Sequence, residues 1–214
     1  MGINIDTSEI QFFLKAVSIN AKKLINKSID TYNNLLQIDP ESAKEIHNEL
    51  GEALEKNGNY DGAIKAYKKI LLTDPNNVSV LFKLGKIYTR LGQSSDALEA
   101  LKKVTVLDEN IPEAFYLLGS VYFSADANAE AQTALNRAIT LNPGYADAYY
   151  KLGLIADARN DHDASINAYL KAVAFKPDFV KAYQSLGFAY ESKGMRDEAV
   201  KYFKKSMEIE QKNS

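Results

Sequence analysis

The sequence contains no cysteine and only two histidines, His47 and His162, among its 214 residues. Without cysteine the chain forms no disulfide bond, supplies no thiolate nucleophile and builds no zinc site with sulfur ligands. Such a composition suits a reducing compartment. Redox chemistry at sulfur and disulfide-stapled folds are therefore excluded.

Excess charge and long apolar runs are also missing. The chain has 26 lysines and arginines against 28 aspartates and glutamates, whereas a nucleic-acid binder usually carries a basic excess. No window approaches the 18 apolar residues of a membrane-spanning helix, and the opening MGINIDTSEI has no apolar core of a secretory signal. With 46% hydrophobic and 25% charged residues the composition is that of a globular protein. We expect no nucleic-acid partner and no transmembrane segment.

Motifs for catalysis are sparse. Glycine-rich phosphate loops and GxSxG are absent, and the carboxylates follow ordinary helix-surface spacing. His47 falls on an apolar stripe, where we expect a partly buried spacer. His162 stands between Asp161 and Asp163 in a predicted solvated turn, and no second ligand cluster supports metal binding there. We predict no enzymatic activity, no cofactor and no catalytic or metal site.

A repeat of 34 residues organises the chain instead. It is marked by five glycines, each preceded by leucine: Gly51, Gly85, Gly119, Gly153 and Gly187. A small residue stands twelve positions after each glycine: Ala63, Ala97, Ala131, Ser165 and Ala199. A large residue stands sixteen positions after it: Tyr67, Leu101, Leu135, Tyr169 and Phe203. Prolines follow three of the glycines by 24 positions: Pro75, Pro143 and Pro177.

The spacing predicts pairs of helices. The glycine and the positions four and one before it, and three and seven after it, fall on one helical face. The glycine lets the paired helix approach closely. Seven positions after it stand residue types that tolerate a left-handed backbone, so each first helix is predicted to end there: Gly58, Gly92, Asp126, Asn160 and Gly194. Predicted caps of the second helices are Asp61, Ser95, Asp163 and Asp197. Pro112 falls at a predicted first helical position.

In its length and its order of Leu-Gly, aromatic, alanine, aromatic and proline, this repeat resembles the tetratricopeptide repeat family. The resemblance implies an all-α fold, an α-solenoid superhelix of tandem antiparallel helix hairpins. Five units are expected over residues 44–211, at 44–77, 78–111, 112–145, 146–179 and 180–211. Residues 1–43 are expected to form a degenerate N-terminal unit, because 28-SIDTYNNLLQIDP-40 aligns with 63-AIKAYKKILLTDP-75. Residues 212–214 are expected to form a C-terminal tail.

The family geometry implies a peptide-binding groove lined by the first helix of each pair, mainly at positions three before, one after and four after the glycine. The predicted groove residues are Asn48, Glu52, Phe82, Lys86, Arg90, Tyr116, Ser120, Phe123, Tyr150, Leu154, Asp157, Gln184, Phe188 and Glu191. The aromatic residues in the middle suit a partner peptide, although some of them could instead pack between units. Among the middle units only Lys86 and Arg90 are basic at the inner face, which disfavours a clamp for a C-terminal carboxylate.

An apolar stripe near the N-terminus has two interpretations. Ile10, Phe13, Leu14 and Val17 lie at helical spacing. The stripe either packs on the next unit as an end cap or docks into a neighbouring molecule. In the second case this helix is the self-assembly element of the chain.

Three stretches, 74-DPNN-77, 145-YADAYYKLGL-154 and 182-AYQSLGFAYESKGMRDEAVKYFKK-205, are similar to the magnetosome-associated tetratricopeptide scaffolds of magnetotactic bacteria. That resemblance implies a cytoplasmic protein peripherally attached to the magnetosome membrane surface. Such a protein forms homo-oligomers through its N-terminal unit and groove, coats the vesicle and recruits magnetosome membrane-associated proteins. The alternative is a monomeric adaptor that binds a foreign peptide in another bacterial complex.

Overall fold

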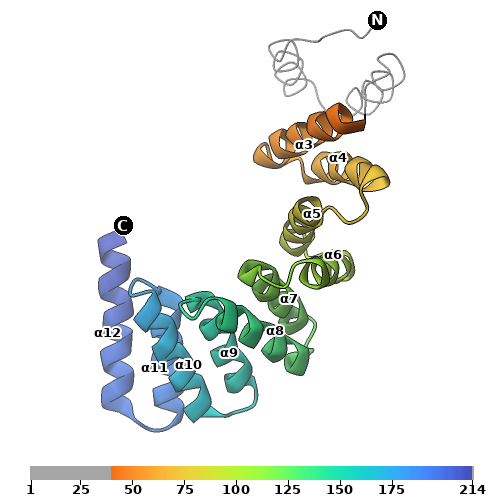
Figure 1. The fold of residues 1–214 in the computed structure, drawn as a ribbon. Helices are drawn as coiled ribbons and strands as arrows, with labels where there is room; N and C mark the ends of the chain where they lie inside the picture. Colours follow the sequence, from red (N-terminus) through yellow and green to blue (C-terminus); the bar gives the residue numbers. More distant parts are fainter. Residues whose placement is uncertain (1–39, 214) are drawn as a thin grey trace, which may run out of the picture. The chain divides into compact units, whose positions relative to one another are not determined.

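The computed structural model describes residues 40–213, which form ten α-helices and no strand (Figure 1). The helices are α3 (Pro40–Lys56), α4 (Tyr60–Thr73), α5 (Val78–Arg90), α6 (Ser94–Leu107), α7 (Pro112–Ser124), α8 (Asn128–Leu141), α9 (Ala146–Ala158), α10 (His162–Phe175), α11 (Val180–Ser192) and α12 (Arg196–Asn213). The predicted all-α class is confirmed. The N-terminal stripe of Ile10, Phe13, Leu14 and Val17 lies outside the described residues, as does most of the predicted unit 1–43.

The chain divides into two compact units, residues 1–87 and 88–214. The described part of the first contains α3, α4 and most of α5. The second contains the end of α5 and the helices from α6 to α12. In each unit consecutive helices pack in antiparallel pairs, α3 with α4 in the first and α7 with α8, α9 with α10 and α11 with α12 in the second (Figure 1).

The second unit also shows how the pairs stack. Helix α8 packs against α9, and α10 packs against α11, so each hairpin contacts the next one along the chain. The core of the last two hairpins joins the fully buried Tyr169 of α10 to Leu186 of α11. A separate cluster around Leu135 and Ile155 joins α8 to α9. Burial between successive hairpins is what stabilises a repeat fold of this kind.

The turn inside each hairpin confirms one prediction. Positive φ angles occur two positions after the last residue of the first helix of each pair, at Gly58, Gly92, Asp126, Asn160 and Gly194. Asp126 and Asn160 take φ angles of 57° and 58°, which short polar side chains tolerate better than other non-glycine residues. Pro112 also stands at the start of α7 as expected.

The predicted helix caps are wrong by two residues. Asn59 and Asp161 cap α4 and α10, accepting hydrogen bonds from the backbone nitrogens of Gly62 (3.2 Å) and Ala164 (3.0 Å). The residues predicted for this role, Asp61, Ser95, Asp163 and Asp197, lie inside the first turns of their helices. The helices begin earlier than predicted because the left-handed residue is followed by a single linking residue. In the first turn an acidic side chain still favours the helix through its dipole.

The repeated glycine lies at a close contact, as predicted. A methyl group on Gly51 would overlap the ring of Tyr67, and one on Gly153 would overlap the ring of Tyr169. Gly119 is similar, since its methyl would lie 2.8 Å from Cγ of Leu135. The large residue sixteen positions later therefore covers the glycine of its own hairpin.

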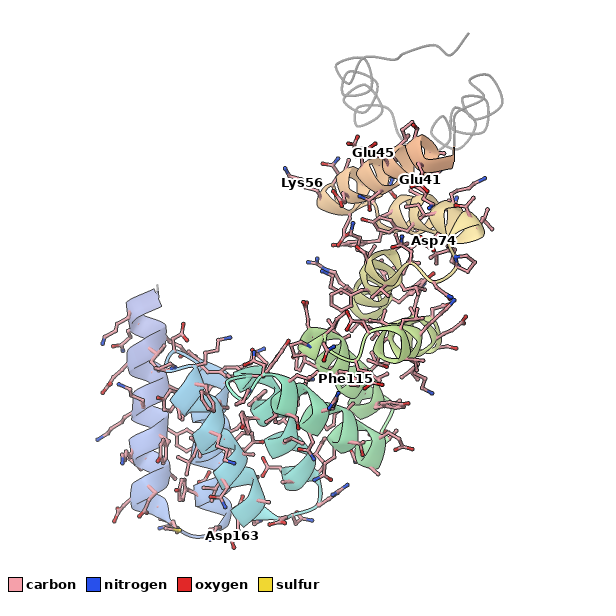
Figure 2. All side chains as sticks on the ribbon, in the orientation of Figure 1. Glu41, Glu45, Lys56, Asp74, Phe115 and Asp163 are labelled. Atoms are coloured by element: carbon pink, nitrogen blue, oxygen red, sulfur yellow. The ribbon has the colours of Figure 1, made fainter. Side chains whose placement is uncertain are left out.

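Charged residues mark the solvent-facing sides of the helices. Glu41, Glu45 and Lys56 are exposed on α3, and Asp163 lies at the start of α10 (Figure 2). Asp163 pairs with Lys193, which follows α11, so the turns of two successive hairpins are linked. This pairing lowers the pKa of Asp163, chiefly through the hydrogen bond from Lys193.

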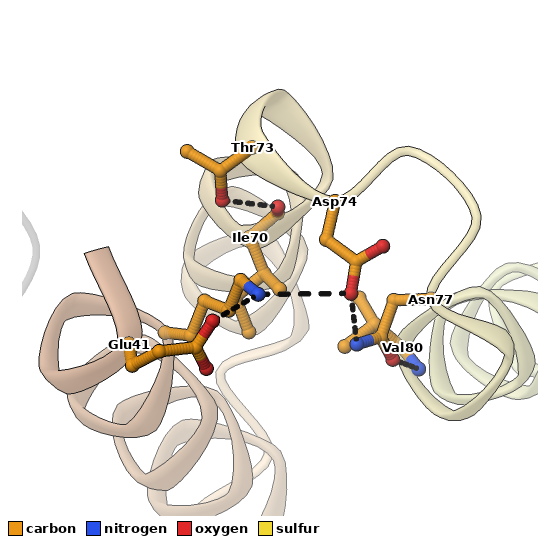
Figure 3. Close-up of polar contacts among 7 residues, drawn as sticks. Glu41, Ile70, Thr73, Asp74, Asn77 and Val80 are labelled. Carbon is orange, nitrogen blue, oxygen red and sulfur yellow. Dashed lines mark hydrogen bonds and ion pairs between the residues drawn. The ribbon is translucent and has the colours of Figure 1, made fainter.

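The turn from α4 to α5 is held by side chains of the 74-DPNN-77 stretch (Figure 3). Asn77 donates to Oδ2 of Asp74 (2.9 Å), and its Oδ1 accepts from the backbone nitrogen of Val80 (3.0 Å). Lys44 of α3 lies 4.0 Å from the Asp74 carboxylate and 2.8 Å from Glu41. This turn therefore caps α5 and contacts the start of α3.

Candidate protein-binding face

In the first unit, two predicted groove residues belong to a polar cluster on α3 and α5. Lys83 donates to Oδ1 of Asn48 (2.7 Å) and to Oε1 of Glu52 (2.6 Å), and Asn48 also donates to Glu52 (3.1 Å). The hydrogen bond from Lys83 lowers the pKa of Glu52. Lys83 was not predicted as a site residue, although it organises the two that were.

The other predicted residues of α5 differ in exposure. Phe82 and Lys86 are half-buried, with the Lys86 ammonium 5.1 Å from the centre of the Phe82 ring. Arg90, at the end of the helix in the second unit, is exposed. The pair of Phe82 and Lys86 presents an aromatic ring and a positive charge one helical turn apart.

In the second unit, several predicted aromatic residues pack against the next hairpin. Tyr116 of α7 stacks on Tyr145, with ring centres 5.0 Å apart. Tyr150 of α9 contacts Phe179 and the ring of Tyr169, at 4.9 and 5.6 Å. The alternative interpretation, in which aromatics pack between units, is therefore correct for Tyr116 and Tyr150. They still keep partial exposure.

Two further predicted groove residues contribute little polar surface. Ser120 is only 9% exposed, so its side chain belongs to the packing of α7. Leu154 packs against the core of the last two hairpins. These two residues therefore help to pack the helices that carry the predicted face.

Asp157 is joined to a buried tyrosine. The Tyr169 hydroxyl donates to Oδ2 of Asp157 at 2.5 Å, and Tyr67 donates in the same way to Glu55 at 3.2 Å in the first unit. Burial raises the pKa values of both phenols, and the carboxylates raise them further. Asp157 thus fastens the second helix of its hairpin to the first.

Helix α11 carries the most open part of the predicted face. Phe188 is 61% exposed, and its ring packs edge-to-face with that of Phe203, with ring centres 5.0 Å apart. Gln184 donates to Glu210 of α12 (3.0 Å), while Glu191 is exposed. An exposed phenylalanine beside amide and carboxylate groups suits a contact with another polypeptide.

Lys151 of α9 is a second residue that the sequence analysis missed. Its ammonium lies 5.2 Å from the centre of the Phe123 ring on α7. The side chain is half-buried, and the loss of hydration lowers its pKa, with Lys181 acting in the same direction and Asp147 against it. Lys83 and Lys151 both stand two positions before a repeat glycine, and that equivalence was the available signal.

Both histidines belong to the packing of the helices. His47 is 6% exposed, and its Nδ1 lies 2.7 Å from the backbone oxygen of Ala43. His162 is the first residue of α10 and is half-buried, which corrects the prediction of a solvated turn. Within residues 40–213 no three side chains of the metal-binding types gather around a common point.

A hollow of about 440 Å³ opens elsewhere in the second unit, between α8, α9 and α10. It is lined by polar side chains such as Gln132, Asn136 and Arg159, and by Tyr149. None of the predicted groove residues lines it. Among the helices of residues 40–213, none combines the length and apolar character needed to cross a membrane.

Sequence profiles of the tetratricopeptide repeat match most of the chain. The matched segments are residues 27–78, 54–121, 120–156, 158–194 and 180–213. A comparison with curated protein sequences gave no match.

Solved structures are similar over most of the chain. Two crystal structures of MamA share 56% and 53% sequence identity with it, at TM-scores of 0.72 and 0.74. The first comparison covers 76% of this chain and 95% of the other, and the second covers 80% and 94%. Residues 41 to the end of MamA from Desulfovibrio magneticus RS-1 share 27% identity at a TM-score of 0.74, over 79% of this chain and 96% of that one.

Proposed function

Because the chain belongs to the MamA-like tetratricopeptide repeat proteins, we propose that it is a self-assembling scaffold that coats the magnetosome vesicle. Its all-α tetratricopeptide solenoid is the fold of protein-interaction scaffolds, which are in general non-enzymatic. The proposed scaffold acts in the cytoplasm, attached peripherally to the magnetosome membrane surface, and recruits magnetosome membrane-associated proteins.

The observation that carries the proposal is the exposed phenylalanine Phe188 on α11, the first helix of the last hairpin. Phe188 is 61% exposed on α11. By contrast, Tyr169, which covers the repeat glycine of its own hairpin, is fully buried. A large apolar side chain held in water is stabilised by burial, at about 1.5–3 kcal/mol when it is complete. This surface favours a contact with a second polypeptide.

The proposed donor is the N-terminal stripe of another copy. Ile10, Phe13, Leu14 and Val17 supply four apolar side chains at helical spacing. Aromatic and aliphatic anchors of this kind are the usual centre of a helix-in-groove contact. In this arrangement the groove of one chain holds the first helix of the next.

The contact is heterologous, because two different surfaces of the chain meet. A heterologous contact that does not close on itself propagates into an open assembly. An open assembly of this type covers a vesicle surface with many copies and leaves other surfaces of each copy accessible to recruited proteins.

The proposal is tested by sedimentation velocity on the full chain and on two substitutions. Phe13→Asp removes the donor and Phe188→Asp removes the acceptor, so both are expected to sediment as monomers while the wild type forms large species. Phe175→Asp is the matched control, since Phe175 is 51% exposed but lies outside the predicted groove. Its ring stacks on Tyr149, and the variant should assemble like the wild type.

A wild-type chain that stays monomeric across the concentration series would contradict self-assembly. It would favour the monomeric adaptor, in which the same face binds a foreign peptide. Assembly that survives Phe13→Asp would contradict the role of the N-terminal stripe.

A further inference from the structure

We propose that Lys151 and Lys181 form a cationic seat for a carboxylate in the N-terminal segment of a second copy, with Glu9 as the principal partner. The inference rests on the proposed self-assembly and names the chemistry of its contact. The seat is defined by Lys151 on α9, Lys181 on α11 and the Phe123 ring on α7.

Lys151 carries a partly buried positive charge that lacks an ionic partner among the described residues. Its stem is half-buried and its ammonium lies over the Phe123 ring at 5.2 Å, yet it makes no ion pair with any described residue. A positive charge removed from water is costly unless an opposite charge or hydrogen-bond acceptors replace the lost hydration. The aromatic ring replaces only part of it.

The equivalent lysine two repeats earlier shows what is missing. Lys83 binds Asn48 and Glu52, which stand three before and one after the glycine of the preceding unit. The same two places before Lys151 hold Tyr116 and Ser120. The carboxylate that Lys83 finds within its own chain therefore has no counterpart for Lys151, and an external carboxylate can supply it.

Nearby charges leave the seat positive. Lys181 lies close enough to Lys151 to repel it. Asp147 attracts Lys151 from one turn earlier on α9, but its carboxylate also lies 3.9 Å from the Lys176 ammonium. Asp147 is thus shared between Lys151 and Lys176, while Lys181 adds a further positive charge.

The N-terminal segment has the complementary composition. Its first fourteen residues contain two carboxylates, Asp6 and Glu9, and neither lysine nor arginine, the first of which is Lys15. In a helix Glu9 and Phe13 are separated by one turn, a rise of about 6 Å, and face the same side. A carboxylate and a phenyl ring at that separation match a seat that joins an ammonium group to the ring of Phe123.

The test uses sedimentation velocity on full chains with exchanged charges. Lys151→Glu and Glu9→Lys are each expected to weaken assembly at least about tenfold, since each leaves like charges facing one another. The two substitutions in one chain should restore a large part of it. Lys171→Glu is the control. Like Lys151, Lys171 lies over an aromatic ring, that of Tyr149 at 5.4 Å, but it is outside the seat.

Restoration by the exchanged pair excludes misfolding as the cause of the single losses. If Phe13→Asp abolishes assembly while Lys151→Glu and Glu9→Lys assemble normally, the seat is overturned and the proposed scaffold stands. Loss in both single variants without restoration in the pair overturns Glu9 as the partner. A wild type that never assembles overturns the seat and the scaffold together.

Discussion

Tyr169 donates its phenolic proton to Asp157, with 2.5 Å between the two oxygens. The tyrosine ring lies over Gly153 of the same hairpin, so one side chain both fills the space above the glycine and fastens the two helices. Tyr67 and Glu55 repeat the arrangement in the first unit. Where the covering residue is Leu101 or Leu135, the corresponding first-helix position holds Thr89 or Phe123 in place of an acid.

Removal of this hydroxyl should destabilise the hairpin. Tyr169→Phe leaves a partly buried carboxylate oxygen without its donor, at a cost of about 1–3 kcal/mol in the free energy of unfolding. Urea unfolding followed by circular dichroism measures the loss. Tyr183→Phe is the control, because the Tyr183 hydroxyl makes no hydrogen bond with a described residue and its ring only stacks on Tyr202. Equal losses in the two variants would contradict the bridging role.

The glycine beneath this ring should resist substitution. Gly153→Ala places a methyl group within the fully buried Tyr169 ring, and overpacking of this kind costs about 1–3 kcal/mol. Alanine returns about 1 kcal/mol through helix propensity, so a net loss in unfolding free energy is expected. Gly144→Ala serves as the comparison, since its methyl would make an ordinary contact at 3.5 Å with Asn142. A stabilised Gly153→Ala chain would contradict the close contact.

Stability should fall at alkaline pH. Burial raises the pKa values of Tyr67, Tyr145 and Tyr169 in the folded chain above that of an exposed tyrosine, so the folded state holds these protons more tightly. The resulting stabilisation is fully present below about pH 10 and is lost as the pH rises above it. Thermal unfolding from pH 8 to 11 measures the decline. Its slope should be shallower in Tyr169→Phe, and an unchanged slope would contradict the assignment to Tyr169.

The hairpin order could be predicted from the sequence because the packing problem repeats. Every unit must cover its glycine and turn its chain, so the same residue types recur every 34 positions, and the left-handed turns at Asp126 and Asn160 could be placed without a structure. The cap positions could not be placed correctly, since Asp61 and Asn59 are both good capping types. Only the helix start decides between them.

The candidate site was less predictable, because its residues do not repeat. The sequence grouped Tyr150 with Phe188, yet Tyr150 packs against Phe179 while Phe188 is 61% exposed. Exposure of an aromatic ring depends on its neighbours in the next hairpin. Lys83 and Lys151 were passed over because the position two before the glycine was not among the predicted groove positions.

Lys151 should lower the stability of the fold. Loss of hydration lowers its pKa, so the unfolded chain binds that proton more tightly and the charge destabilises the folded state below about pH 10. Lys151→Met is therefore expected to raise the unfolding temperature at pH 7, since methionine also packs well against Phe123. The exposed Lys171→Met control should change little. A lowered unfolding temperature in Lys151→Met, measured at a dilution where both chains are monomeric, would show that the lysine stabilises the fold.

The most direct measurement mixes two defective chains. One carries Phe13→Asp and keeps an intact groove, and the other carries Phe188→Asp and keeps an intact N-terminal stripe. If the stripe of one copy occupies the groove of the next, each chain alone is monomeric and the equimolar mixture forms a single species of twice the 23.8-kDa chain mass, and nothing larger. A mixture that remains monomeric in sedimentation velocity would contradict the head-to-tail contact.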